Sequence, residues 1–212
     1  MKTEVLSAQD PEALRRALAV LREGGMVAFP TDTVYGVGTL AFQGAAVERI
    51  YAAKDRPQEK SIPVLIADPA DLAKVTLEVP EAAARLAGHF WPGALTLVVK
   101  KHPDLPEAVS ATATVGVRIP DHAVARALLR MAGPMAVTSA NRSGQPSPST
   151  AQEVLGQLGG RIALIIDGGK TPGGVPSSVV DCTGTEPVIL RAGPISEAEI
   201  RSALGPGLSS FY

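Results

Sequence analysis

Short apolar runs alternate along this chain with segments that carry the start signals of helices, and this alternation constrains the fold strongly. The runs predict strands at Met26–Phe29, Ile62–Ile66, Leu95–Val99, Thr114–Pro120, Met135–Val137, Ile162–Ile166, Ser177–Asp181 and Val188–Leu190. Capping residues and apolar spacing predict helix starts at Asp10–Pro11, near Ala45, at Asp68–Pro69, near Glu81, at Asp121, at Ser149 or Thr150, and at Ser196. Several links between strands are too short for a crossover helix, so we expect an α/β fold with helices packed on one mixed sheet.

Polar side chains crowd together where two of the predicted strands end. Pro30–Gly38, with the sequence Pro-Thr-Asp-Thr-Val-Tyr-Gly-Val-Gly, follows the strand at Met26–Phe29. Thr138–Gly144 follows the strand at Met135–Val137. An ordinary turn explains either segment alone, since glycine lets the backbone bend tightly beside polar residues. Because α/β proteins usually bind ligands at strand ends, the two segments together indicate a ligand site.

Composition sets limits on the class of protein. A chain of 212 residues with 45% hydrophobic and 19% charged residues is typical of a folded globular protein. No linker interrupts it, so we expect a single domain over residues 1–204 and a mobile tail over 205–212. The net charge of -1 gives no global sign of a nucleic-acid or membrane surface. No apolar run approaches the ~20 residues of a membrane span, and none resembles a leader, so we expect a cytoplasmic protein.

The inventory of reactive side chains favours binding of an anion over hydrolysis. No serine or cysteine lies in a G-x-S-x-G motif, and the lone Cys182 excludes an internal disulfide and a C-x-x-C metal site. Arginines near strand ends suit bidentate contact with carboxylate or phosphate groups. A solvated basic turn is the alternative for the charge cluster at Lys54–Lys60. Together with nearby hydroxyl groups, the cations indicate a site for an anionic ligand such as a nucleotide.

Nine segments, in order along residues 10–200, resemble the YrdC/Sua5 family of threonylcarbamoyl-AMP synthases. They are Pro30–Gly38, Lys54–Pro57 with Lys60, Phe90–Thr96, Val117–Pro120, Ser139–Gly144, Ser147–Ser149, Asp167–Gly169, Ser177–Asp181 and Ile189–Gly193. The resemblance implies a twisted open sheet with a large concave active-site face. It also implies a nucleotidyltransferase that converts L-threonine, bicarbonate or CO2, and ATP into threonylcarbamoyl-AMP and pyrophosphate. A downstream threonylcarbamoyl transferase complex would use that product to make the t6A base of tRNA.

The resemblance also assigns roles to particular residues. It implies catalytic roles for Lys54, Arg56 and Arg118. The residues implied to bind ATP are Arg56, Lys60, Thr114, Ser139, Asn141, Ser149 and Arg191. Those implied to bind threonine are Thr31, Thr33, Arg118, Thr138 and Ser177, and which of the first two threonines contacts the substrate stays open. Mg2+ is expected on the phosphates of ATP, with no metal ligand from the protein.

The chain departs from the family pattern at two places, and two alternative functions stay open. Ala94 stands where a second proline is expected, and Pro176-Ser177-Ser178 replaces the usual Glu-Ser-Thr. The chain resembles the short form of the family, and the tail at 205–212 is hypothesised to fold over the site. One alternative is an RNA-binding module without synthase activity, to which weak tRNA or double-stranded RNA binding would belong. The other is a domain that adenylates a different carbamoyl substrate, as in hydrogenase maturation, but such proteins carry extra zinc-finger-like modules.

Overall fold

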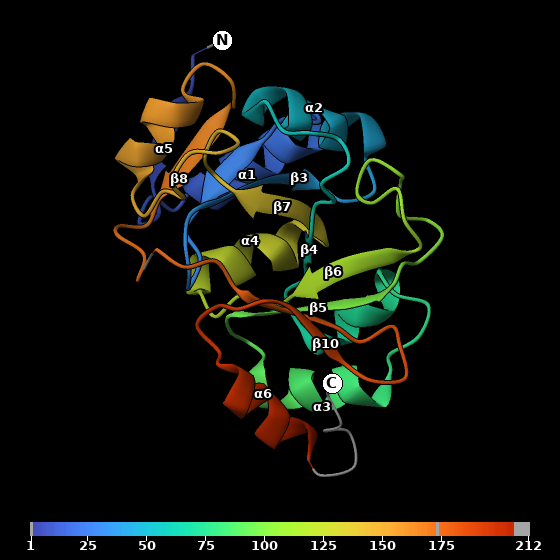
Figure 1. Cartoon of the computed structure of the whole chain (residues 1–212). Coiled ribbons are helices and arrows are strands. Elements are labelled where there is room, and N and C mark those ends of the chain that lie inside the picture. The colour runs from blue at the N-terminus through green and yellow to red at the C-terminus, as the bar shows by residue number, and fades with distance from the viewer. Residues whose placement is uncertain (1, 173, 206–212) are drawn as a thin grey trace.

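The computed structural model describes residues 2–172 and 174–205, and within them ten strands form one sheet in the order β1-β8-β2-β3-β7-β4-β6-β5-β9-β10 (Figure 1). The strands are β1 (Glu4–Ser7), β2 (Val27–Phe29), β3 (Gly36–Leu40), β4 (Val64–Leu65), β5 (Leu95–Lys100), β6 (Thr114–Arg118), β7 (Met135–Ser139), β8 (Leu164–Asp167), β9 (Ser178–Asp181) and β10 (Val188–Arg191). The sheet contains both parallel pairs, such as β5/β9, and antiparallel pairs, such as β5/β6. The predicted mixed sheet is therefore confirmed.

Helices pack on both faces of this sheet and enclose two apolar cores. They are α1 (Ala13–Arg22), α2 (Gly44–Lys54), α3 (Glu81–Phe90), α4 (Ala123–Ala132), α5 (Ala151–Leu158) and α6 (Glu197–Leu204), with a 3-10 helix, η1, at Pro69–Lys74. The sheet separates the two cores, as the alternating side chains of β2 show. Ala28 packs with α2 and α5 on one face, whereas Val27 and Phe29 pack with α1 and α4 on the other. Helices α3 and α6 lie side by side at the end of the molecule opposite α5 and β8 (Figure 1).

Part of one sheet face carries no helix, and the alternation of side chains along the strands exposes a polar surface there. In β5, Leu95, Leu97 and Val99 are buried in the core shared with α3, while Thr96 and Val98 point to the opposite face. That opposite face is the one that α1 and α4 cover farther along the sheet, where Leu65 and Val137 join their core. The uncovered part is where a ligand can reach the strands.

Most predicted strands are confirmed with shifted ends, but two were missed. The five residues of Ile62–Ile66 yield only the pair β4, and Thr138 and Ser139 belong to β7 rather than to a loop. β1 was not predicted. The alternative of an ordinary turn at Pro30–Gly38 does not hold for its last three residues, because Gly36–Gly38 begin strand β3. A Cβ on Gly38 would lie 2.5 Å from the carbonyl oxygen of Ala136, so the glycine permits close approach of β7.

The predicted helix caps were right at the two serine and threonine boxes and wrong at Asp10 and Asp121, while Asp68 occupies the N-cap position of η1, as predicted, without a capping bond from its side chain. Thr150 accepts from the backbone N–H of Glu153, and Ser196 forms a full capping box with Glu199. In contrast, α1 begins only at Ala13, and the Asp10 carboxylate accepts from the Glu12 N–H in a turn before it. Asp68 and Asp121 likewise cap nothing with their side chains. Asp68 instead pairs with two arginines of α4.

Nothing among the described helices is long and apolar enough to cross a membrane. Of the expected tail, residues 206–212 lie outside the described residues, so the hypothesis that it folds over the site stays a hypothesis.

Candidate functional site

A cleft of about 320 Å3 opens on the uncovered part of the sheet, and it collects residues from segments far apart in the sequence. Its polar side chains come from the loop after β2, from the segment after α2, from β5, β6 and β7, and from the segments around β9 and β10. Eight of the predicted site residues line it: Thr31, Thr33, Arg56, Arg118, Thr138, Ser139, Ser177 and Arg191. The apolar floor includes Leu65, Val98, Val137 and Val179. The structure thus brings together most of the residues that separate sequence segments suggested.

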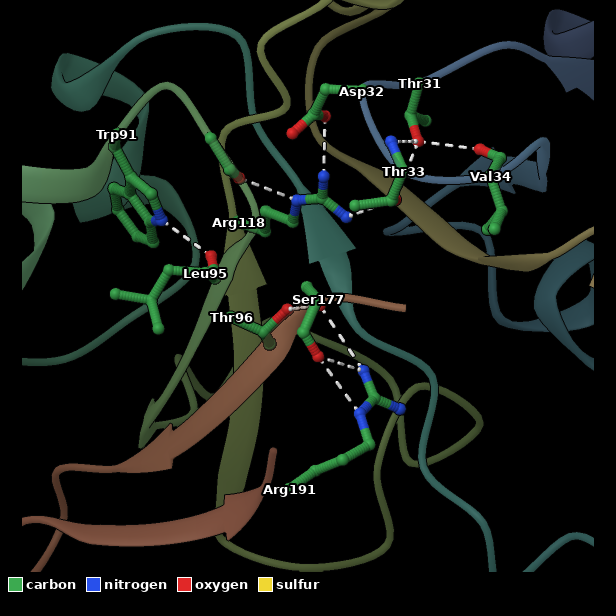
Figure 2. A network of polar contacts seen from close by, with 11 residues as sticks. Thr31, Asp32, Thr33, Val34, Trp91, Leu95, Thr96, Arg118, Ser177 and Arg191 are labelled. Carbon is green, nitrogen blue, oxygen red and sulfur yellow. Dashed lines mark hydrogen bonds and ion pairs between the residues drawn. The ribbon is translucent and has the colours of Figure 1, made fainter. Parts of the chain in front are cut away.

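Arg118, at the end of β6, is the most firmly held cation of the cleft (Figure 2). Its Nε donates to the carbonyl oxygen of Gly93 at 2.9 Å, and one terminal nitrogen donates to Thr33 Oγ1 at 3.1 Å. Its other terminal nitrogen forms an ion pair with Asp32 at 2.5 Å. Burial lowers the pKa of this guanidinium, and the Asp32 charge opposes that effect. The side chain therefore has a fixed orientation, with three of its five N–H groups used by the protein.

The loop between β2 and β3 is ordered by its own hydroxyl groups. Thr31 Oγ1 donates to the carbonyl oxygen of Val34 at 2.7 Å and lies 3.0 Å from Thr33 Oγ1. The same oxygen accepts from the backbone N–H of Thr33. Both threonine side chains are buried and line the cleft (Figure 2). Tyr35, next in the motif, points elsewhere: its hydroxyl donates to the carbonyl oxygen of Gly169, and burial raises its pKa to about 12.

Arg191, at the end of β10, reaches across to Ser177 beside β9 (Figure 2). Its Nε and one terminal nitrogen donate to the Ser177 carbonyl oxygen at 3.0 and 2.8 Å. Ser177 Oγ lies 2.8 Å from the hydroxyl of Thr96, a buried cleft residue to which the sequence reasoning gave no role. Burial, and secondarily the charge of Arg118, lower the pKa of Arg191. The two arginines repel each other, and an anion between them would relieve that repulsion.

Arg56 lines the cleft from the chain segment that follows α2. Its Nε and one terminal nitrogen donate to the carbonyl oxygens of Lys60 and Ser61, at 3.1 and 2.8 Å. Lys60 itself is exposed and does not line the cleft. Among the described residues, neither Arg56 nor Arg191 has a carboxylate partner, in contrast to Arg118. No neighbouring carboxylate therefore neutralises the charge that these two arginines present to a ligand.

Lys54 lies at the end of α2, fully buried, and holds the backbone beside the cleft. Its Nζ donates to the carbonyl oxygens of Ser139, which lines the cleft, and of Asn141. Burial, and secondarily Arg56, lower its pKa to about 7. Lys54 thus contacts the wall of the cleft from behind rather than its open side.

Three other predicted residues lie outside the lining of the cleft. Thr114 bonds to the hydroxyl of Thr112, and Ser149 bonds to Glu153 at the start of α5. Asn141 is buried and donates to two backbone carbonyls through Nδ2, while its Oδ1 has no partner among the described residues. That free acceptor is suited to an N–H donor of a ligand.

Within residues 2–172 and 174–205 there is no group of three or more His, Cys, Asp and Glu side chains that could hold a metal ion. Cations and hydroxyl groups, which line the cleft instead, bind anions rather than metals. Fold and cleft together define the class: an α/β protein, built on one mixed sheet, with a cleft lined by arginines and hydroxyl groups.

Comparison with known proteins places the chain within that class. The Sua5/YciO/YrdC family model, described as "Telomere recombination", matches residues 19–193. The chain therefore belongs to the Sua5/YciO/YrdC family, as the order of its motifs predicted.

Relatives in this family share most of the chain. It is 47% identical over 207 residues to the "Threonylcarbamoyl-AMP synthase" of Bacillus subtilis, covering 96% of this chain and 60% of that protein. It is 40% identical over 215 residues to a "Putative threonylcarbamoyl-AMP synthase" of Mycobacterium tuberculosis, covering 99% of each. The structure of P. abyssi Sua5 complexed with L-threonine superimposes with a TM-score of 0.91 at 41% identity, covering 97% of this chain and 61% of that one. The chain thus spans about three fifths of two of these relatives.

Proposed function

We propose that this chain is an L-threonylcarbamoyl-AMP synthase, a nucleotidyltransferase that uses L-threonine, bicarbonate or CO2, and ATP. The observation that supports it most is the convergence of Arg56, Arg118 and Arg191 with the threonine and serine hydroxyls in one cleft. Relatives named as this synthase share the chain almost from end to end, and a related structure contains L-threonine. These comparisons favour the synthase over an RNA-binding module without activity.

The proposed reaction requires charge stabilisation more than proton transfer. The amine nitrogen of threonine first bonds to the carbon of CO2 and loses a proton, giving a carbamate; with bicarbonate as the source, water is released. A carbamate oxygen then forms a bond to the α-phosphorus of ATP, while the bond to the bridging oxygen breaks and its electron pair leaves with pyrophosphate. Negative charge accumulates on the phosphoryl oxygens, so fixed cations lower the barrier. Positioning of the two substrates supplies the rest.

The cleft suggests how its cations divide this task. Arg118, held in one orientation, is suited to the planar carboxylate of threonine. Arg56 and Arg191, which lack carboxylate partners among the described residues, are suited to the phosphates and the nucleotide. Lys54 would hold the Ser139 segment in place behind them. Mg2+ would arrive on the phosphates of ATP and add to their neutralisation.

The proposal also covers the fate of the product and the location of the enzyme. Threonylcarbamoyl-AMP would pass to a threonylcarbamoyl transferase complex that modifies tRNA, with weak RNA contact by this chain as an accessory property. We propose a cytoplasmic location for both steps.

Pyrophosphate release from ATP by the purified protein tests the proposal. Omission of L-threonine and of bicarbonate, each in turn, should abolish release, because the acceptor carbamate then cannot form. Release that continues without L-threonine, or none with all substrates present, would contradict the proposed function.

A further inference from the structure

A second pocket lies away from the cleft, where α2 meets the segments that lead into β2 and β8, at the end of the molecule that carries α5 (Figure 1). Its volume is about 400 Å3, within the range of ~300–1,000 Å3 that is usual for small-molecule pockets. The residues that line it are Gly24, Gly25, Met26, Arg49, Ala52, Ala53, Arg161 and Ala163. None of them lines the cleft. The pocket meets the start of β2 and the cleft meets the loop after it, so the two are separate sites.

Small side chains leave this space open. Gly24 and Gly25 form the turn after α1, where Gly24 has a φ of +75° and a Cβ on Gly25 would lie 2.6 Å from a methyl group of Val20. Alanines complete the walls, two from α2 and one from the segment before β8. Backbone and methyl groups therefore form much of the surface. No carboxylate occurs among the described residues that line the pocket.

Two arginines supply the charge of the pocket, and its own walls hold both guanidinium groups. Arg49, on α2, donates from one terminal nitrogen to the carbonyl oxygen of Gly24 at 3.2 Å. One terminal nitrogen of Arg161 donates to the carbonyl oxygen of Ala53 at 3.1 Å and to the Asp55 carboxylate at 3.1 Å. In each arginine, Nε and the second terminal nitrogen make no hydrogen bond within the described residues. These N–H groups are available to an anion in the pocket.

We propose that this pocket is a second ligand site, which binds a small organic anion made of an apolar ring system and one acidic group. An inorganic anion alone would leave the apolar walls without contacts. A neutral apolar molecule would leave the N–H groups of Arg49 and Arg161 without an acceptor. Guanidinium groups bind the oxygens of an acidic group in pairs and also lie flat against aromatic rings, so one ligand can satisfy both parts of the pocket. The inference does not depend on the reaction proposed for the cleft.

Fluorescence titration of the whole protein with two dyes tests this inference. Anilinonaphthalenesulfonate carries an apolar ring system and a sulfonate, and phenylnaphthylamine is the same ring system without the acid. An excess of ATP, with L-threonine omitted, occupies the cleft throughout, so that dye bound elsewhere is measured. The variants are Arg49→Met, which removes a charge but keeps an apolar side chain, and Ala52→Leu, which fills the pocket. Arg15→Met is the control, because it removes an equal charge from α1 outside the pocket.

Arg49→Met should weaken binding of the sulfonate about tenfold and change binding of the neutral dye little. Ala52→Leu should weaken binding of both dyes, and Arg15→Met should affect neither. All three positions are exposed, so the variants should fold like the wild-type protein. Absence of sulfonate binding to the wild-type protein in excess ATP would overturn the inference. Unchanged binding in Ala52→Leu, or equal losses of both dyes in Arg49→Met, would do the same, because the dye would then bind elsewhere or without regard to charge.

Discussion

Arg118 has the most complete support of the cleft's cations, because a backbone carbonyl, a hydroxyl and a carboxylate each take one of its nitrogens. A buried guanidinium without such partners would be costly, so Asp32 is part of the arrangement although it does not line the cleft. Among the residues that the structure describes, Arg191 donates hydrogen bonds to Ser177 alone. The two arginines therefore differ in rigidity, which fits separate tasks.

Crossed substitutions test that division of tasks. Arg118→Lys keeps the charge next to Asp32 but loses the planar fork, so it should raise the KM for L-threonine about tenfold or more and change that for ATP little. Arg191→Lys should show the reverse pattern. Steady-state kinetics of pyrophosphate release measure both constants. Equal increases for both substrates in either variant would contradict the assigned roles.

Lys54 predicts a pH dependence of stability. Its folded pKa of about 7 lies below the ordinary 10.5, so the folded state loses this proton first as the pH rises. The free energy of unfolding should therefore increase between about pH 7 and 10.5, by at most about 1.4 kcal/mol per pH unit. Below pH 7 both states are protonated, and the full cost of the buried charge is present.

Urea unfolding at several pH values measures this effect, with Lys54→Met as the control that cannot titrate. The wild-type protein should gain stability relative to Lys54→Met as the pH rises from 7 to 9. Parallel pH profiles for the two proteins would show that Lys54 does not carry the dependence.

For individual residues, the sequence predicted which side chains meet in the cleft. It missed two residues that hold them in place, Thr96 and Asp32. Eight predicted residues line one cleft because motifs at several strand ends converge there. Thr96 could have been found, since alternation along Leu95–Val99 places it on the face opposite Leu95 and Leu97. The contact of Asp32 with Arg118 joins residues 86 positions apart, and no local pattern reveals it.

Among the elements, the pairing of β3 with β7 brings the end of Pro30–Gly38 beside Thr138 and Ser139. Their register places Gly36 opposite Ser139 and Gly38 opposite Val137. The glycines allow the strands and their side chains to approach closely. The sequence pattern suggested a bend here because glycine signals a turn as readily as a close contact. Only tertiary packing distinguishes the two.

Substitution of one glycine in β3 should be far more costly than substitution of one in α3. In Gly38→Ala the new Cβ would lie 2.5 Å from the Ala136 carbonyl oxygen and 2.6 Å from a methyl group of Val137. We expect a loss of about 2 kcal/mol or more in the free energy of unfolding. Gly88→Ala is the control, because its Cβ meets nothing within 4 Å, and it should be neutral or stabilising by up to about 1 kcal/mol. Similar unfolding midpoints in urea for both variants would refute this account of Gly38.

Over the whole molecule, α2, α3, α5 and α6 pack on one face of the sheet, whereas α1 and α4 cover only part of the other. The alternation of strands and helices predicted the α/β class and the mixed sheet, because both follow from local patterns and link lengths. The order of the strands could not be predicted that way. Strand β9 pairs with β5, far from it in sequence, and this pairing brings Ser177 to Thr96. The cleft is therefore a product of topology.

We propose above all that this cleft joins carboxylated threonine to the adenylate of ATP. Mass spectrometry of the product formed with isotope-labelled bicarbonate tests it most directly. We predict an adenylate that contains threonine and carries the label on the carbon joining the two. An unlabelled adenylate of threonine would contradict the account, because the enzyme would then activate the amino acid itself without the carboxylation step.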